Sequence, residues 1–241
     1  VALLIDADNS PASKIGVILN ELSTFGETNV RRAYGNWKKN ELKGWEEQLH
    51  EHAIRPMQQF DYSKGKNASD MAMVIDALDL LYTDSPDAFG IVSSDADFTP
   101  LVVHLRAKGA ADYGFGLRKT PEPFVNACSR FLFLDKLGSP ATEPEEAGDA
   151  PQAKLRATTA QLKQDTRLVM LLRNAVAAAA DDEGWARVGA VGHQIANQAS
   201  FDPRNYGYAT LTKLLVATQL FDIADEGKST VVVRDKRLKK T

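Results

Sequence analysis

The chain has 241 residues, of which 44% are hydrophobic and 25% are charged, and its formal net charge at pH 7 is −3. This composition predicts a globular protein with a normal core, in one large domain or two modest ones. It excludes a membrane-spanning helix, since no run approaches about 18 apolar residues, and the net charge argues against a protein that coats nucleic acid without specificity.

Strand-like and helix-like patterns alternate along the first 137 residues. Short apolar runs predict strands at residues 2–6, 30–34, 54–60, 89–93, 111–116 and 131–134. Helical patterns fall between them, at residues 11–24, 39–51, 68–83, 98–108 and 122–128. Alternation of this kind implies a mostly parallel sheet with helices on both faces, so we expect an α/β, Rossmann-like three-layer domain. In the third helix, one apolar face at helical spacing consists of Met71, Val74, Ile75, Leu78 and Leu81.

The composition changes after Leu137. Residues 138–151 contain three prolines, two glycines and four acids with almost nothing apolar, which predicts a flexible linker over residues 138–160. Helical patterns follow at about 161–180, 187–199 and 207–218, and strand-like pieces at 220–224 and 230–234 enclose a hairpin signal at 225–228. Three helices and a two-stranded wing describe a winged helix-turn-helix domain at 161–236.

The charges are divided between the two parts. Residues 1–137 carry 15 Lys and Arg against 19 Asp and Glu, and without Asp6, Asp8, Asp95 and Asp97 this part would be neutral. Residues 154–241 carry 14 basic and 9 acidic residues, a mildly basic balance that suits a polyanion-binding module. The single Cys128 excludes an internal disulfide and suits a reducing compartment, so we expect a cytoplasmic protein. No signal peptide is visible, but Val1 already lies in a strand pattern, so we expect that an upstream piece has been trimmed.

Two acidic clusters follow the first and fourth predicted strands, Asp6 with Asp8 and Asp95 with Asp97. Open α/β sheets bind ligands at the carboxyl ends of their strands, where the strand order reverses, so we expect Asp6 and Asp95 to face each other across one crevice. Carboxylates that converge there repel one another unless they hold a cation. The all-oxygen ligand set favours Mg²⁺ or Mn²⁺.

Asp70, at the start of the helix at 68–83, is a fifth candidate for the same crevice. The chemistry that needs such an arrangement is metal-assisted hydrolysis of a phosphodiester. Lys64 and Lys66, together with backbone amides at the helix start, are expected to balance the charge of a bound phosphate.

A purely structural interpretation is open for three of these acids. Asp97 and Asp8 stand where helix N-caps are expected, and Asp70 in a first helical turn gains from the helix dipole without a metal. Asp6 and Asp95 differ, because a carboxylate that directly ends a buried strand has no capping role.

Trp37 and Lys38 combine an aromatic ring with a cation after the second strand. Single-stranded bases stack on such rings while lysines contact the backbone. The alternative is that Trp37 packs under the following helix and that the lysine is only solvated.

Three segments in order, VALLIDADN, KGKNASDMAMVIDAL and GIVSSDADFTPLVVHLRAKG, resemble the NYN domain, a branch of the PIN-like nuclease superfamily, over about residues 1–137. The resemblance implies a ribonuclease dependent on Mg²⁺ or Mn²⁺. It matches Asp6, Asp70, Asp95 and Asp97 to the catalytic acids, with Asp6, Asp95 and Asp97 on the metal and Asn9 beside them in contact with substrate. Asp8 matches a more variable position.

The later segments GWARV, FDPRNYGY and LTKLL resemble an OST-HTH, or LOTUS, domain over about residues 161–236. This resemblance implies a winged helix that binds RNA, including structured guanine-rich RNA, and in some relatives a helicase partner. Tyr206, Gly207 and Tyr208 are expected to open its third helix. Arg204, Tyr208 and Lys213 are the candidate RNA contacts.

The leading hypothesis is therefore a metal-dependent endoribonuclease with a C-terminal RNA-binding winged helix, with oligomers and a protein partner possible and no membrane association. The second is a non-catalytic RNA-binding or scaffold protein with a relic acidic pocket. The third is a haloacid-dehalogenase-like phosphatase with Asp6 as its nucleophile. Ser10 argues against the third, because that family usually carries Thr or Val there.

Overall fold

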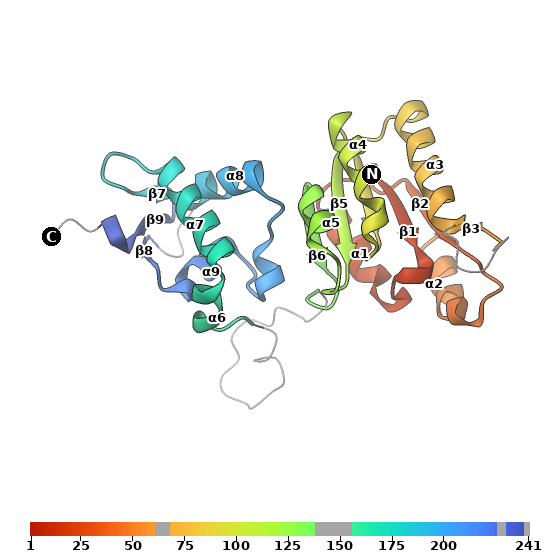
Figure 1. The fold of residues 1–241 in the computed structure, drawn as a ribbon, viewed down its shortest axis with the longest axis horizontal. Helices are drawn as coiled ribbons and strands as arrows, with labels where there is room; N and C mark the ends of the chain where they lie inside the picture. Colours follow the sequence, from red (N-terminus) through yellow and green to blue (C-terminus); the bar gives the residue numbers. More distant parts are fainter. Residues whose placement is uncertain (61–67, 138–155, 226–229, 239–241) are drawn as a thin grey trace. The chain divides into compact units, whose positions relative to one another are not determined.

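The computed structural model describes residues 1–60, 68–137, 156–225 and 230–238, and the chain divides into two compact units, Val1–Gly138 and Ser139–Thr241. The ribbon in Figure 1 follows both units along the chain. No helix of the described residues is long and apolar enough to cross a membrane.

The first unit is built on a parallel sheet of six strands in the order β3-β2-β1-β4-β5-β6. The strands are β1 (Ala2–Asp6), β2 (Val30–Gly35), β3 (Arg55–Gln58), β4 (Ala88–Val92), β5 (Ala111–Gly116) and β6 (Arg130–Phe133). The order reverses between β1 and β4, which pair directly with Ile5 opposite Val92. The expected α/β fold is confirmed, and the first and fourth strands flank the reversal as predicted.

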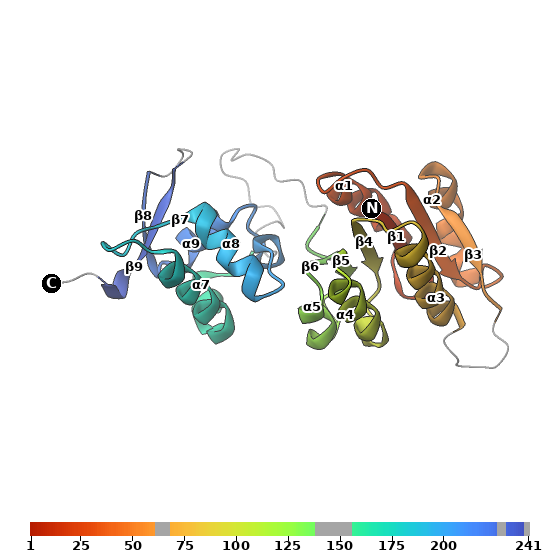
Figure 2. The same cartoon turned by 90° about the horizontal axis from the view of Figure 1, so that it is seen from above.

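Five helices cover the two faces of this sheet, as Figure 2 shows from above. They are α1 (Ile15–Ser23), α2 (Glu46–Glu51), α3 (Ala68–Thr83), α4 (Thr99–Ala107) and α5 (Glu122–Ala127). The helix predicted at 11–24 begins as a 3₁₀ turn at Ala12–Lys14, and the one predicted at 39–51 begins as a 3₁₀ turn at Asn40–Trp45.

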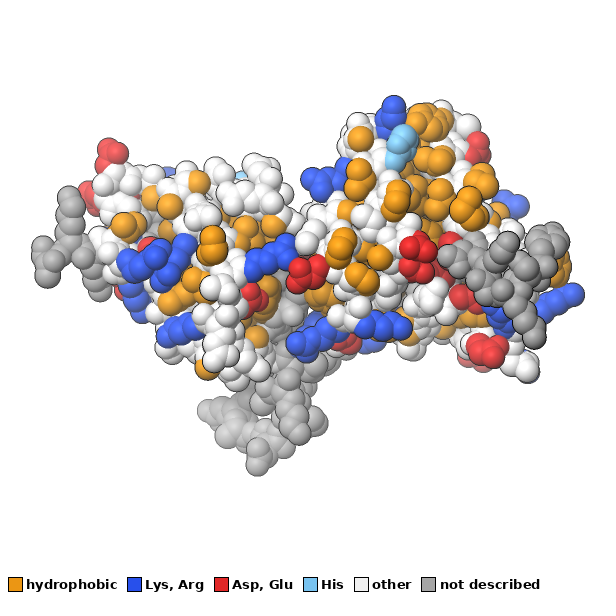
Figure 3. All heavy atoms as spheres, viewed as in Figure 1, with side chains coloured by type: hydrophobic (Ala, Val, Ile, Leu, Met, Phe, Trp, Pro, Cys, Tyr) orange, Lys and Arg blue, Asp and Glu red, His pale blue; other side chains and the backbone are white. Residues whose placement is uncertain are grey.

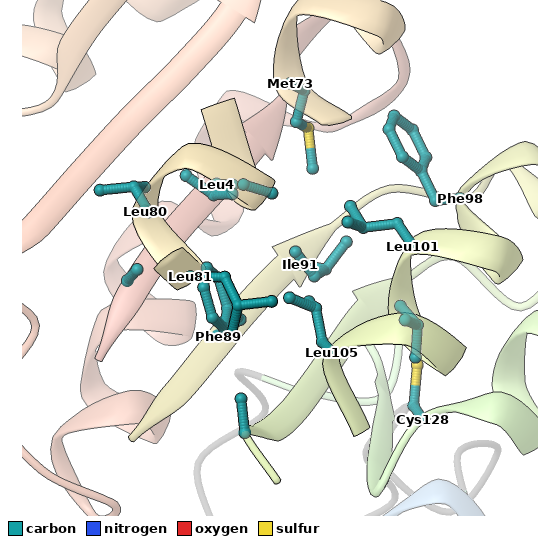
Figure 4. Packing of buried hydrophobic residues seen from close by; sticks show 14 of the residues in the cluster. Leu4, Met73, Leu80, Leu81, Phe89, Ile91, Phe98, Leu101, Leu105 and Cys128 are labelled. Carbon is teal, nitrogen blue, oxygen red and sulfur yellow. The ribbon is translucent and has the colours of Figure 1, made fainter. Parts of the chain in front are cut away.

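The core divides into two hydrophobic clusters, one on each side of the sheet. Strand β1 contributes side chains to both clusters, because successive residues of a strand point to opposite faces of the sheet. Leu4 packs with α3, α4 and α5, and Ile5 packs with α1. Figure 4 shows the first cluster, in which Met73 of α3 and Leu105 of α4 converge on Ile91 of β4. Burial on both faces explains why the central strands are continuous apolar runs.

The face that α3 turns to the core differs from the predicted one. Its buried side chains are Met73, Ala77, Leu80 and Leu81, whereas Met71 and Ile75 are exposed. The predicted face was wrong in this respect because α3 is apolar on two sides, and helical spacing alone does not tell which side meets the sheet.

The second unit contains four helices, α6 (Thr159–Gln164), α7 (Thr166–Ala179), α8 (Val188–Gln198) and α9 (Leu211–Thr218). The single helix predicted at 161–180 is divided at Asp165, whose side chain accepts a hydrogen bond from the backbone N–H of Leu168 and caps α7. Helix α6 begins with a capping box formed by Thr158 and Gln161, so the predicted linker overlaps its first turn. Residues 138–155 of that linker lie outside the described residues.

The wing of this unit is an antiparallel sheet of three strands rather than the predicted two. It pairs β7 (Ala186–Arg187), β9 (Val232–Asp235) and β8 (Phe221–Ala224) in that order. A strand of two residues carries no periodic signal, so the sequence pattern missed β7. The predicted hairpin turn lies outside the described residues except for Asp225.

Gly114 of β5 tests how tightly the first core is packed. A Cβ atom there would lie 2.4 Å from Cδ2 of Phe131 and 2.6 Å from Sγ of Cys128. We expect Gly114→Ala to destabilise the first unit by about 1–3 kcal/mol, because both neighbours are buried. Hydrogen exchange of peptides from β5 and β6 measures the change. Gly44→Ala, where no atom lies within 4 Å, is the matched control, and equal protection in both variants would contradict the packing.

Candidate active site

Asp6 ends β1 and is almost fully buried at the carboxyl edge of the sheet. Its Oδ2 accepts hydrogen bonds from Ser93 Oγ at 2.7 Å and from Asn9 Nδ2 at 3.0 Å. Its Oδ1 is also buried, and no partner for it exists among the described residues. Burial raises the pKa of Asp6, while the bonds from Ser93 and Asn9 oppose that rise. One oxygen of this carboxylate is therefore held in place and the other is unsatisfied.

Asp95 lies in the loop after β4, and Ser93 links it to Asp6. The backbone N–H of Asp95 donates to Ser93 Oγ at 3.0 Å, and the same hydroxyl donates to Asp6. Oδ1 of Asp95 accepts from the backbone N–H of Asp97 at 2.9 Å, so Asp95 caps the 3₁₀ turn Ala96–Phe98. The prediction that Asp95 has no capping role was wrong, because β4 ends at Val92 and the loop turns at Asp95.

The predicted capping roles of Asp97 and Asp8 were also wrong. Asp97 lies inside the 3₁₀ turn, and the residue before α4 is Phe98. Asp8 lies in a 3₁₀ turn at Ala7–Asn9, and its Oδ2 accepts a hydrogen bond from Ser69 Oγ at 3.1 Å. Nζ of Lys39 approaches Oδ1 of Asp8 at 3.4 Å. Asp8 thus connects β1 to the start of α3 and to the loop after β2.

Asp70 lies in the first turn of α3, as predicted, and shares the field of the other four acids. Burial together with repulsion from Asp6, Asp95, Asp8 and Asp97 raises the pKa of Asp70 to about 6. A carboxylate feels such repulsion only when the others are near. Five carboxylates from β1, α3 and the loop after β4 therefore share one edge of the sheet.

This donor set fits a hard divalent cation in its chemistry. All donors are carboxylate oxygens, one buried oxygen of Asp6 lacks a partner, and the acids repel one another. As their side chains stand, no three His, Cys, Asp or Glu residues among those described are close enough to surround one ion. A cation would therefore have to draw the carboxylates inward.

Two contacts at this edge were not predicted. Lys39 and Ser69 both contact Asp8, and each lies directly beside a residue that was predicted, Lys38 and Asp70 respectively. The predicted phosphate contacts Lys64 and Lys66 lie outside the described residues.

Trp37 packs rather than offering a free ring. Its side chain is half-buried against the cluster that contains Leu42 and Trp45, and its indole nitrogen is buried without a described partner. This contact favours the packing interpretation of Trp37. Lys38 is exposed, and its ammonium lies 5.0 Å from the ring centre of Phe60, which is itself exposed at the end of β3.

Two of the three candidate RNA contacts in the second unit have structural partners. The guanidinium of Arg204 binds the buried Asp202 through Nε at 2.9 Å and Nη2 at 2.8 Å. The hydroxyl of Tyr208 donates to the carbonyl of Ala157 at 2.7 Å, which fastens the chain before α6. Lys213 is exposed on α9.

The expected helix start at Tyr206, Gly207 and Tyr208 was wrong. Pro203–Tyr206 form a 3₁₀ turn, and Gly207 ends it in the left-handed conformation at φ 84°. Helix α9 begins only after Thr210, whose hydroxyl accepts a hydrogen bond from the backbone N–H of Lys213.

Comparison with known proteins divides the chain in the same order. Residues 1–135 match the family model of the NYN domain, and residues 162–233 match that of the OST-HTH/LOTUS domain. No curated protein matches the chain. Among solved structures, a protein of unknown function from Vibrio parahaemolyticus is 18% identical, with a TM-score of 0.44, over 55% of this chain and 90% of its own.

The repulsion at Asp70 gives a pH-dependent effect on stability. Burial and the neighbouring carboxylates raise the folded-state pKa to about 6, above the ordinary value of 3.8, so the unfolded chain releases this proton first and stability falls as the pH rises from about 4 to about 6. We expect Asp70→Asn to raise the Tm at pH 7.5 in EDTA and to have little effect near pH 4. Thermal unfolding of both proteins at the two pH values measures this. Asp84→Asn, at the other end of α3, is the control and should leave the Tm unchanged; a Tm gain for Asp70→Asn that is equal at both pH values would contradict the repulsion.

Proposed function

Because the chain belongs to the NYN domain family and carries an OST-HTH/LOTUS domain after it, we propose that it is a metal-dependent endoribonuclease that hydrolyses RNA phosphodiester bonds. NYN domains are PIN-like nuclease domains, and OST-HTH/LOTUS domains bind RNA. The metal dependence, the catalytic residues and the endonucleolytic cut are our proposal.

The observation that carries this proposal is the gathering of five carboxylates at one edge of the sheet, where burial and their repulsion together raise the pKa of Asp70. Clusters of like charge destabilise a fold, and strongly perturbed acids in one place indicate a functional site. The partnerless Oδ1 of Asp6 supports the same interpretation, since a buried carboxylate oxygen without a donor suits a cation.

We assign Asp6, Asp95 and Asp97 to the metal, with Mg²⁺ or Mn²⁺ as the fitting ions. A divalent ion held there supplies positive charge for phosphoryl transfer and lowers the pKa of water. Ser93 and Asn9 fix the orientation of Asp6 through their bonds to Oδ2, so Oδ1 is the oxygen that would bind the ion. Asn9 is exposed beside this carboxylate and is our candidate for contact with the RNA.

Asp70 is assigned to the attacking water. It lies in the first turn of α3, at the edge that holds the other four acids, and its carboxylate can accept the water proton. Lys39, which pairs with Asp8, would balance part of the charge of the RNA backbone, and Lys38 follows Trp37 directly before it in the chain. The same role for Lys64 and Lys66 stays a prediction from the sequence.

The second unit is assigned to RNA binding. Its attachment to the catalytic unit raises the local concentration of RNA, so weak contacts from the basic part are sufficient. Lys213 is the leading phosphate contact, because it is exposed, whereas Arg204 and Tyr208 have the structural partners described above.

A non-catalytic RNA-binding protein with a relic site is the alternative that remains. Membership of the NYN family does not favour the phosphatase hypothesis. All five acids of the edge are in place here, which favours catalysis over a relic.

Cleavage of a labelled single-stranded RNA tests the catalytic assignment. We expect cleavage with Mn²⁺ or Mg²⁺, none with EDTA, and a loss of at least about a hundredfold in Asp95→Asn, because the ion loses a charged ligand. Asp84→Asn, an exposed acid at the far end of α3, is the matched control and should cleave normally. Equal rates for Asp95→Asn and the unaltered chain would refute the assignment.

Binding of RNA tests the second unit separately. We expect Lys213→Ala to weaken RNA binding and to lower the slope of log affinity against log salt by about 1, with no change in Tm. Arg204→Ala should instead lower the Tm, because it leaves the buried Asp202 without its guanidinium. Fluorescence anisotropy at several salt concentrations, together with thermal unfolding, separates the two effects. An unchanged salt slope in Lys213→Ala would remove this residue from the interface.

A further inference from the structure

Helix α3 carries a second apolar face on the side away from the core. Met71, Ile75 and Tyr82 recur at intervals of four and seven residues, which places them on one stripe of the helix, while Leu78 beside the stripe packs partly against the core. The three stripe residues are 60–62% exposed. A helix that is apolar on nearly all sides is normally buried. None of the described residues covers this stripe.

The stripe continues onto the neighbouring helix α4. Val103 there is 54% exposed, and Tyr82 joins the helices through a hydrogen bond of 2.9 Å to Nε2 of His104. Figure 3 shows hydrophobic side chains gathered over these helices. We call Met71, Ile75, Tyr82 and Val103 the α3/α4 face. It holds four of the eight exposed large hydrophobic residues of the described chain, and such clustering marks an interaction site.

The charges on the two sides of this face have opposite signs. Asp79 lies on the side of α3 that faces β2, since Asp76, one turn earlier, binds Arg32 of that strand. Arg106 lies on the far side of α4, where its guanidinium donates to the carbonyl of Ala127 at the end of α5. The face therefore has an acidic edge and a basic edge, with the apolar residues between them and the ammonium of Lys108 5.9 Å from the ring centre of Tyr82.

We infer that the α3/α4 face is a two-fold interface between two copies of this chain. In an isologous contact the same patch meets itself, so a patch with one acidic and one basic edge is complementary to its own copy. A two-fold axis that runs along the helices places α3 of one copy over α4 of the other. Asp79 then stands opposite Arg106 of the second copy twice, around an apolar centre, which is the usual anatomy of a protein interface.

This arrangement has a consequence for the candidate active site. Asp70 lies in the first turn of α3 and Asp97 lies just before α4, so both helices start at the acidic edge of the sheet. An axis parallel to the helices keeps the acidic edges of both copies at the same end of the dimer. A single RNA strand could therefore meet two sites. The dimer itself does not depend on catalysis.

Sedimentation velocity of the full chain in the micromolar range tests the interface. We expect twice the 26.4 kDa mass of one chain, and at least about a tenfold weaker association for Ile75→Glu. Met170→Glu is the matched control, because Met170 is equally exposed but lies on α7, and it should remain dimeric. A monomer at all concentrations, or an Ile75→Glu variant that still dimerises, overturns the inference. A monomer whose α3 is nevertheless protected from hydrogen exchange also overturns it, because another segment then covers the face.

Charge reversal tests the self-complementary arrangement and guards against a variant that misfolds. Asp79→Arg and Arg106→Glu should each weaken the homodimer, because each places like charges opposite one another twice. An equimolar mixture of the two variants should recover the dimer mass, since both contacts again pair opposite charges. Recovery in the mixture also shows that both variants are folded. A mixture that associates no better than either variant alone overturns the two-fold pairing of Asp79 with Arg106.

Discussion

Five carboxylates that repel one another lie at one edge of the parallel sheet, and this repulsion determines what the candidate site of the first unit can bind. The strand order places β1 beside β4, so Asp6 and the loop that carries Asp95 meet at the reversal point. Ser93 links Asp6 to Asp95 by hydrogen bonds to both, and Lys39 forms an ion pair with Asp8, so one described cation faces five carboxylates at this edge. Repulsion of this kind destabilises the fold unless a bound ligand neutralises it. Carboxylate oxygens favour a divalent cation as that ligand.

The sequence was sufficient to predict the sheet, the pairing of β1 with β4 and the meeting of the acids, because apolar runs and βα alternation define a parallel sheet. It was not sufficient to predict which acid caps a turn. Asp95 and Asp97 are two residues apart, and only the path of the loop decides that Asp95 accepts the N–H of Asp97. Likewise, the periodicity of the sequence does not predict that Arg204 pairs with Asp202.

The sequence was also not sufficient to predict which side of α3 is buried. Helical spacing predicted one apolar face, whereas the helix has two, and packing against Leu4 and Phe89 of the sheet decides which is buried. The exposed face then becomes informative, because Met71 directly follows the catalytic candidate Asp70. One helix thus connects the acidic edge with a surface that is complementary to its own copy.

A calorimetric titration of the full chain with Mn²⁺ at pH 6, in two buffers that differ in ionisation enthalpy, tests whether the five carboxylates form a metal site. We expect saturable binding that releases protons, because a cation lowers the pKa of Asp70 from about 6, and we expect Asp6→Asn to abolish this binding. Absence of saturable binding, or equal binding by Asp6→Asn, would contradict the claim that these carboxylates form a metal site.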